Sequence, residues 1–204
     1  TNVRRGIKRA VLFSDLHYSH ATQDTCFKVL DFIREKAIKY GAVVYFLGDF
    51  WDHVYRRGTL PVDLLNKMIR YFKTEWNVCT VMIPGNHDWF DSAETEHGLE
   101  AFRGIKGIEI YDYPTLDKNN ILFIPYMKDL EHIEKLCKHE EQIPTAIMAH
   151  LDVIGAKMSS KKVSTKGLPH GIFKVPTYSG HYHTPSQYGN VCYIGSSYQV
   201  HLGE

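Results

Sequence analysis

The sequence lacks the patterns that mark several common protein classes. Its four cysteines form no Cys-x-x-Cys pair, which argues against a zinc cluster or a disulfide framework and favours buried free thiols in a reducing compartment. No apolar run approaches the ~20 residues of a membrane span, and no secretory signal is recognisable. Lys and Arg number 24 against 23 Asp and Glu, so bulk charge does not indicate a nucleic-acid or membrane binder. We therefore expect a soluble, cytoplasmic protein.

The length of the chain limits the number of domains that it can form. Its 204 residues, of which 44% are hydrophobic, suffice for one domain with a substantial core. We find no internal repeat and no low-complexity tract. We therefore expect residues 1–204 to form a single domain. Because the first residue is Thr1 rather than Met, we expect a trimmed or processed chain.

The first half alternates strand and helix patterns. Apolar residues at helical spacing predict a helix from Thr22 or Asp24 to about Tyr40, ended by Gly41, and a second helix with Pro61 at its first position. This order predicts a right-handed α/β unit whose parallel strands end at one edge. Apolar runs predict its strands over residues 10–13, 42–47 and 78–83.

The second half predicts another sheet. A short helix is expected over 99–102, an amphipathic helix over 128–139, and a long connection rich in Lys, Ser and Gly over 151–173. Residues 117–120 are expected to form the turn between the first two strands of this half. The two halves indicate two sheets packed face to face with helices outside. The strands are expected over residues 108–111, 121–124, 145–149 and 191–194.

Five stretches share one pattern, in which an apolar run and a turn are followed by Asp or His. In the most informative of them, Asn86 can offer a carbonyl oxygen to a metal, His87 can give or accept a proton, and Asp88 can orient that imidazole. Because such stretches follow strands, we expect their polar side chains to converge. The stretches are Phe13–His17, Leu47–Asp52, Ile83–Trp89, Met148–His150 and Ser179–His183.

The polar residues of these stretches form an oxygen and nitrogen ligand set without sulfur. Such a set suits Mn²⁺, Fe or Zn²⁺ rather than a structural zinc cluster. Seven ligands are too many for one transition metal and suit two, and Asp49 is the natural bridge between them. In an extended segment, His181 and His183 point the same way and can reach one metal each. The expected metal ligands are Asp15, His17, Asp49, Asn86, His150, His181 and His183.

The motif order DLH, GDFWD, GNHD, AH and GHYH resembles the calcineurin-like metallophosphoesterase superfamily. The likeness spans Phe13 to His183. It implies a four-layer αββα sandwich of two mixed sheets flanked by helices. It also implies that His87 stabilises the transition state or protonates the leaving oxygen, and that Asp88 orients His87. The implied ligands are Asp15, His17 and His183 for the first metal, Asn86, His150 and His181 for the second, and Asp49 for both.

Two features indicate which branch of the superfamily the chain resembles. Protein Ser/Thr phosphatases carry GDxxDRG and GNHE, whereas this chain has Asp52-His53-Val54 and Gly-Asn-His-Asp, which disfavours that branch. Residues 124–126, 150–156 and 193–204 look like those of SbcD-type DNA-repair nuclease subunits. That likeness implies manganese and an SMC-like ATPase partner. SbcD-type proteins continue into a capping domain and an ATPase-binding segment, which these 204 residues do not contain. A homodimer is a further open alternative.

Local charge suggests how a phosphoester could be held. Arg56 and Arg57 follow the Asp49 stretch, and Lys161 and Lys162 lie in the connection between the His150 and His181 stretches. Such cations can line a phosphate path, although a solvated loop without ligand explains them equally simply. Aromatic residues beside the ligand stretches, Tyr18 or Trp51, could stack on a base or pack into the core.

Three functions follow from this reading. The first is a nuclease that hydrolyses DNA phosphodiester bonds through a hydroxide bridging two divalent ions, with Mn²⁺ preferred and Fe, Zn²⁺ or Ni²⁺ as alternatives. The second is a phosphohydrolase for a small phosphomonoester, phosphodiester or phosphoprotein. The third is a non-catalytic metal-binding scaffold on the same fold.

Overall fold

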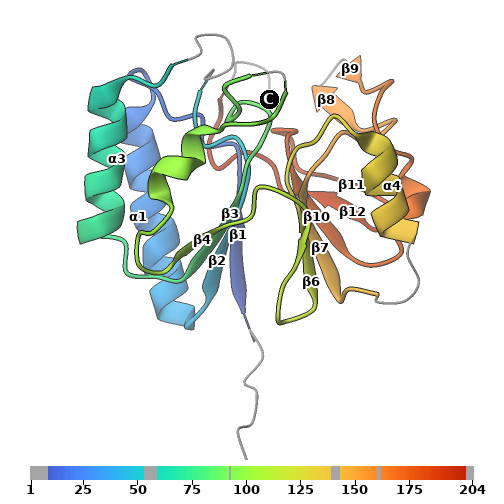
Figure 1. The fold of residues 1–204 in the computed structure, drawn as a ribbon, viewed down its shortest axis with the longest axis horizontal. Helices are drawn as coiled ribbons and strands as arrows, with labels where there is room; N and C mark the ends of the chain where they lie inside the picture. Colours follow the sequence, from blue (N-terminus) through green and yellow to red (C-terminus); the bar gives the residue numbers. More distant parts are fainter. Residues whose placement is uncertain (1–8, 53–58, 92, 139–142, 160–161, 201–204) are drawn as a thin grey trace, which may run out of the picture.

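The computed structural model describes residues 9–52, 59–91, 93–138, 143–159 and 162–200. The two larger of the three sheets that these residues form pack against each other, with helices on the outer side of each (Figure 1). Helices α1 (Gln23–Tyr40) and α3 (Val62–Thr74) cover one sheet, and α4 (Leu130–Lys138) covers the other. This is the four-layer sandwich that the sequence predicts.

The first sheet has the order β1-β2-β3-β4, and all of these strand pairs are parallel. The sequence predicts two mixed sheets, whereas the described strands of this one are parallel because each reaches its neighbour through a crossover. The run Val44–Leu47 is buried throughout, as expected where layers cover both faces. The strands are β1 (Ala10–Phe13), β2 (Val43–Leu47), β3 (Thr80–Ile83) and β4 (Ile108–Ile110).

The helices of the first half form largely as expected. Gly41 ends α1 in a left-handed conformation, with φ of 56°, and its N–H bonds to the carbonyl of Ile38. Pro61 precedes α3 instead of being its first residue, because its ψ of 124° is not helical. The 3-10 helix η1 (Gly98–Phe102) forms where the short helix over 99–102 is expected.

The second sheet is mixed, with parallel strands in its centre and antiparallel strands at both edges. Its order is β11-β12-β10-β7-β6-β5. The edge strands β5 and β11 are too short to show a sequence pattern, and we did not predict them. The strands are β5 (Thr115–Leu116), β6 (Ile121–Ile124), β7 (Ala146–His150), β10 (Thr177–Gly180), β11 (Ser186–Tyr188) and β12 (Val191–Tyr193).

One prediction about the second half is wrong. The turn over 117–120 joins β5 to β6, because β4 pairs with β3 in the first sheet. The predicted connection over 151–173 is folded, and several of its apolar side chains reach the core. It contains β8 (Lys157–Ser159), β9 (Lys162–Val163) and η2 (His170–Ile172), and Leu151, Val153, Ala156 and Leu168 are buried.

A hydrophobic layer joins the two sheets. It consists of Tyr45, Leu47, Val81, Ile83, Phe123 and Met148. The Phe123 ring, which is fully buried, lies 5.1 Å from that of Tyr45 and 5.2 Å from that of Tyr111, centroid to centroid. These contacts fix how the strand ends of the two sheets meet.

None of the helices in the described part of the chain has the length and apolar character that a membrane span requires.

We expect Phe123→Ala to lower the free energy of unfolding by about 3–5 kcal/mol, because it leaves a cavity between the sheets. Tyr113→Ala is the control, since Tyr113 is 69% exposed. Denaturant unfolding of both variants measures the difference. Equal, small losses for the two variants would contradict this account of the inter-sheet core.

Candidate metal centre

The predicted site residues gather where the strands of both sheets end. Asp15 and His17 follow β1, Asp49 follows β2, and Asn86 follows β3 in the first sheet. His150 is the last residue of β7, and His181 and His183 follow β10 in the second sheet. In Figure 1 these strand ends meet along the upper edge of the sandwich. The convergence expected from the sequence is therefore what the structure shows.

Several of these residues have an unusual backbone conformation. The φ angles of Asp15, His17, Asp49 and His181 are 53°, 46°, 60° and 91°, in a region that side chains other than glycine rarely adopt. Each such residue costs about 1–3 kcal/mol unless its surroundings hold it. Backbone bonds from Asp15 to Gly48 (2.9 Å) and from His17 to Asp49 (3.1 Å) brace the first two loops against each other. The fold thus sustains strain where polar side chains must converge.

Two glycines permit the close approach of these loops. A Cβ at Gly85 would lie 2.2 Å from Asp49 Oδ1, and a Cβ at Gly180 would lie 2.3 Å from the carbonyl oxygen of Leu47. Neither position can therefore hold a side chain without displacing the loop beside it. The glycines in the GNHD and GHYH motifs have this steric role.

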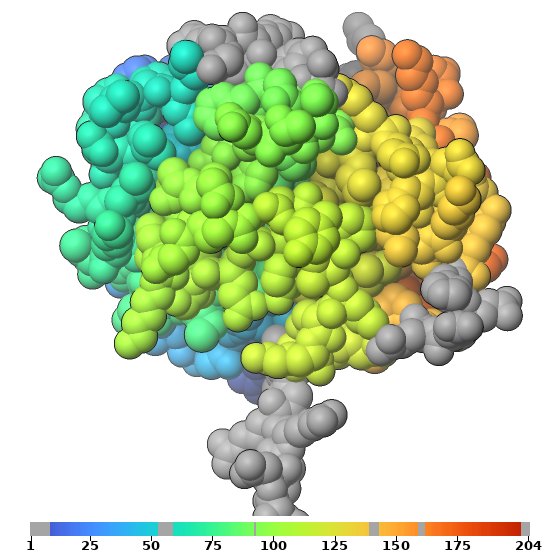
Figure 2. Space-filling view, in the orientation of Figure 1, coloured from blue at the N-terminus to red at the C-terminus, as the bar shows by residue number. Residues whose placement is uncertain are grey.

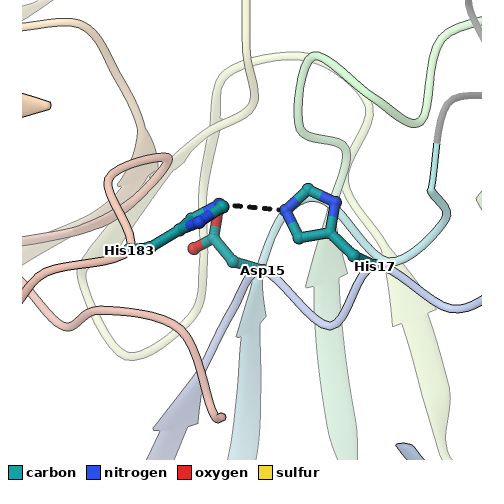
Figure 3. A group of neighbouring side chains, drawn as sticks. All are labelled: Asp15, His17 and His183. Carbon is teal, nitrogen blue, oxygen red and sulfur yellow. Dashed lines mark hydrogen bonds and ion pairs between the residues drawn. The ribbon is translucent and has the colours of Figure 1, made fainter. Parts of the chain in front are cut away.

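The first ligand group consists of Asp15, His17 and His183 (Figure 3). Nε2 of His17 lies 3.1 Å from Nε2 of His183, and the latter lies 3.8 Å from Asp15 Oδ1. Ligand atoms of all three residues lie within 4.8 Å of one another. This is the group that the family resemblance implies for the first metal.

The second group combines Asp49, His150 and His181 with Asn86. Asn86 Oδ1 lies 3.0 Å from Nε2 of His150 and 2.8 Å from Nδ1 of His181. Asp49 Oδ2 is 3.4 Å from Nε2 of His150, and Asp49 also clusters with His17 and His87. Asp49 therefore lies between the two groups, and His181 and His183 reach one group each.

The hydrogen bonds of the imidazoles show which ring nitrogens are free to coordinate. Nδ1 of His150 lies 2.8 Å from the Leu47 carbonyl, which only accepts, so this nitrogen carries the proton. Nε2 of His181 likewise donates to Asp152 Oδ1 at 3.2 Å. When each ring is neutral, as a metal-binding histidine is, its remaining lone pair points at the Asn86 oxygen. Lone pairs facing an oxygen repel unless a proton or a metal cation lies between them, as in metal sites with oriented histidines.

The charges of the site also favour bound cations. Asp15 and Asp49 are buried, and among the described residues they form ion pairs only with imidazoles. Burial raises the pKa of Asp15. Burial opposes protonation of His150, but Asp49 and Asp15 outweigh it and raise the pKa of His150 to about 9. Burial lowers the pKa of His17 to about 3, which keeps it in the neutral form that coordinates metals. The donor set therefore fits two divalent cations.

Asp88 has a structural role that the sequence does not reveal. Its carboxylate is buried and accepts four backbone N–H bonds of 2.8–3.0 Å. The donors are the amides of Asp49, Phe50, Trp51 and Gly85. Asp88 thus fastens the Asp49 loop to the Asn86 loop, and its orientation of His87 stays a prediction. The sequence could not show this, because backbone amides leave no mark in the residue pattern.

His87 lies where a catalytic histidine is expected. Its ring is partly exposed and lies 4.8 Å from that of His17, centroid to centroid. Its backbone N–H donates to Asp49 Oδ1 at 2.8 Å. The side chain of His87 thus lies at the rim of the site, and its backbone is anchored to Asp49.

Sequence reasoning missed Asp152. Its carboxylate accepts from His181 Nε2 and from the hydroxyl of Tyr182, so it holds a predicted ligand in place. Ser14 is similar, since its hydroxyl donates to Asp15 Oδ2 at 2.5 Å. Asp152 lies two residues after His150, and this proximity is the only signal in the sequence.

The predicted substrate residues have different outcomes. Arg56, Arg57 and Lys161 lie outside the described residues, and Lys162 is exposed on β9. Tyr18 and Trp51 are each 1% exposed, which excludes the predicted stacking on a base. A backbone bridge between these two residues holds both rings in the core of the first half.

We expect Asp152→Ala to lower the affinity for one of two bound Mn²⁺ ions about 10- to 100-fold, because His181 loses the acceptor that orients it. Asp152→Asn, which keeps an acceptor oxygen, should lose less. Asp24→Ala, an exposed position on α1, is the control. Calorimetric titration of the chelated protein measures the affinities. Equal affinities in Asp152→Ala and Asp24→Ala would show that Asp152 does not position a ligand.

We expect divalent cations to stabilise the fold, because they neutralise two buried carboxylates whose ion-pair partners among the described residues are imidazoles. Binding to the native state at 100 times Kd adds ~2.7 kcal/mol per site. Thermal unfolding with Mn²⁺ and with chelator measures the shift. Asp49→Ala should lose most of it, and a full shift in that variant would contradict a site built on Asp49.

Two solved structures are similar to this chain. The Pseudomonas putida nuclease MPE is 20% identical, with a TM-score of 0.44, and the alignment covers 86% of this chain and 62% of that one. This chain thus spans 62% of the length of that nuclease. A second solved structure is 12% identical, with a TM-score of 0.53, and the alignment covers 92% and 90% of the two chains. No curated protein matches the chain.

The match to a family model identifies the family of the chain, because it covers nearly all of the described fold. The sequence profile of the family described as calcineurin-like phosphoesterase matches residues 8–196, which include every predicted metal ligand. Members of this family hydrolyse phosphoesters and typically bind two divalent metals. The match and the clustered Asp and His side chains together show that this chain belongs to the calcineurin-like phosphoesterase family.

Proposed function

We propose that the chain is a metal-dependent nuclease that hydrolyses phosphodiester bonds in DNA. The observation that carries the proposal is a set of lysines on the folded connection over 151–173. This connection leaves the site after His150 and leads back to it through β10. Lys157, Lys162 and Lys166 are all exposed on it. Cations along a polyanion neutralise its phosphates, so this segment suits DNA better than a small monoester.

One of these lysines lies next to the predicted ligands. Lys166 and Lys128 line a pocket of about 180 Å³, together with His150 and Asp152. A phosphate adjoining the scissile one would meet two cations there. The likeness of residues 124–126, 150–156 and 193–204 to SbcD-type nucleases supports the same reading.

The side chains have distinct roles in the proposed reaction. Asp15, His17 and His183 would hold one cation, Asn86, His150 and His181 the other, and Asp49 both. When bound, the cations would activate a water and neutralise charge on the phosphate. The oxygen and nitrogen donors suit Mn²⁺ first, with Fe, Zn²⁺ and Ni²⁺ as alternatives. His87, at the rim, would donate a hydrogen bond or a proton to a phosphate oxygen.

We expect Mn²⁺, added after chelation, to support cleavage of DNA, and His87→Ala to lower kcat about 10²- to 10⁴-fold. The assay compares single-stranded DNA, duplex DNA, bis-p-nitrophenyl phosphate and p-nitrophenyl phosphate. His132→Ala, at an exposed position on α4, is the control. Both variants should still bind two cations, so the difference between them reports on the reaction.

Two outcomes would overturn the proposal. Hydrolysis of the small esters with DNA left intact would make the chain a phosphohydrolase of small substrates. Two bound cations with no turnover of any ester would favour a metal-binding scaffold.

A further inference from the structure

The side chain of Tyr126 stands at the edge of the metal centre. It follows β6, and its backbone N–H donates to the carbonyl of Pro84 at 2.9 Å. Its ring centroid lies 6.2 Å from that of His150 and 6.2 Å from that of His181. The plane of its ring is tilted by 35° from that of His181. An aromatic ring is thus fixed beside the second ligand group, at the junction of the two sheets.

Two pockets share this ring. The larger, about 250 Å³, is lined by Asn86, Trp89, Asp91, Glu94, Tyr126 and Lys128. The smaller is the pocket of His150, Asp152 and Lys166 described above, and it also includes Tyr126 and Lys128. The two segments that form the larger pocket are joined by a bond from the Lys128 N–H to Glu94 at 3.2 Å. Figure 2 shows the green chain after β3 and the yellow-green chain around β6 side by side on this face.

The charges of the two pockets differ. The smaller pocket contains two lysines and one carboxylate, whereas the larger contains Lys128 with two carboxylates, Asp91 and Glu94. A phosphate is favoured in the smaller pocket and disfavoured by the acids of the larger one. A neutral group has no such penalty beside Tyr126 and Trp89. A nucleotide carries both chemistries, a flat neutral base and an anionic phosphate.

We propose that Tyr126, Lys128 and Lys166 form a nucleotide subsite in which Tyr126 stacks on the base next to the scissile phosphate. The lysines bind the adjoining phosphate. A base can stack on a protein ring only after leaving its own helical stack, so the subsite selects single-stranded over duplex DNA. This inference rests on the proposed nuclease function and deepens it. Tyr18 and Trp51 cannot take this role because both are buried.

Two diesters with the same leaving group isolate the contribution of the base. One is the p-nitrophenyl ester of thymidine 5′-phosphate, and the other is methyl p-nitrophenyl phosphate. For Tyr126→Ala, we expect the ratio of their kcat/KM values to fall about 5- to 100-fold, the size of one base–aromatic stack. Tyr126→Leu, which keeps apolar bulk without an aromatic face, should show the same fall. Tyr126→Phe should keep the wild-type ratio, as should the exposed control Tyr113→Ala.

The results distinguish a failure of the proposed subsite from a failure of the proposed nuclease function. If the wild type cleaves DNA but Tyr126→Ala and Tyr126→Leu lower both diesters equally, Tyr126 only shapes the metal centre and the subsite is wrong. If Tyr126→Phe loses as much as Tyr126→Ala, the hydroxyl matters and stacking is wrong. If the wild type cleaves neither DNA nor the diesters with two cations bound, the proposed function itself fails.

Discussion

Two buried carboxylates, Asp15 and Asp49, impose the main constraint on this structure. They lie at the meeting point of two sheets, and their ion-pair partners among the described residues are imidazoles. Buried negative charge is costly unless a positive charge lies beside it. Protonated histidines can supply that charge in part, as the raised pKa of His150 indicates. Divalent cations would supply it while using the lone pairs that converge on Asn86. The fold and its chemistry thus depend on the same two buried carboxylates.

The remaining features of the site follow from bringing these groups together. Four of the predicted ligands adopt left-handed backbone conformations, and Asp88 binds two of the loops through backbone amides. Glycines remain where loops cross too closely for a side chain. The hydrophobic layer around Phe123 holds the two sheets in register so that both halves of the site meet. The left-handed residues cost local stability, and packing elsewhere offsets that cost.

Much of this arrangement could be predicted from the residue pattern, and the failures have physical causes. Strands β1 and β6 lie over the expected residues, because continuous apolar runs are read directly. The ligand set emerged because each member follows a strand. Edge strands of two or three residues, such as β5, carry no periodicity and were missed. The amide bonds of Asp88 and the role of Asp152 were missed, because they depend on the backbone or on groups distant in sequence. Tyr18 and Trp51 were ambiguous, since an aromatic residue beside a loop can face either way.

The central claim is that one site, shared between the two sheets, binds two divalent cations. A crystal structure of the protein with Mn²⁺, with anomalous scattering data collected near the manganese edge, tests it most directly. The account predicts two peaks about 3.5–4 Å apart, with Asp49 between them. Asp15, His17 and His183 should surround one peak, and Asn86, His150 and His181 the other. A single peak, or none, at saturating Mn²⁺ would contradict it.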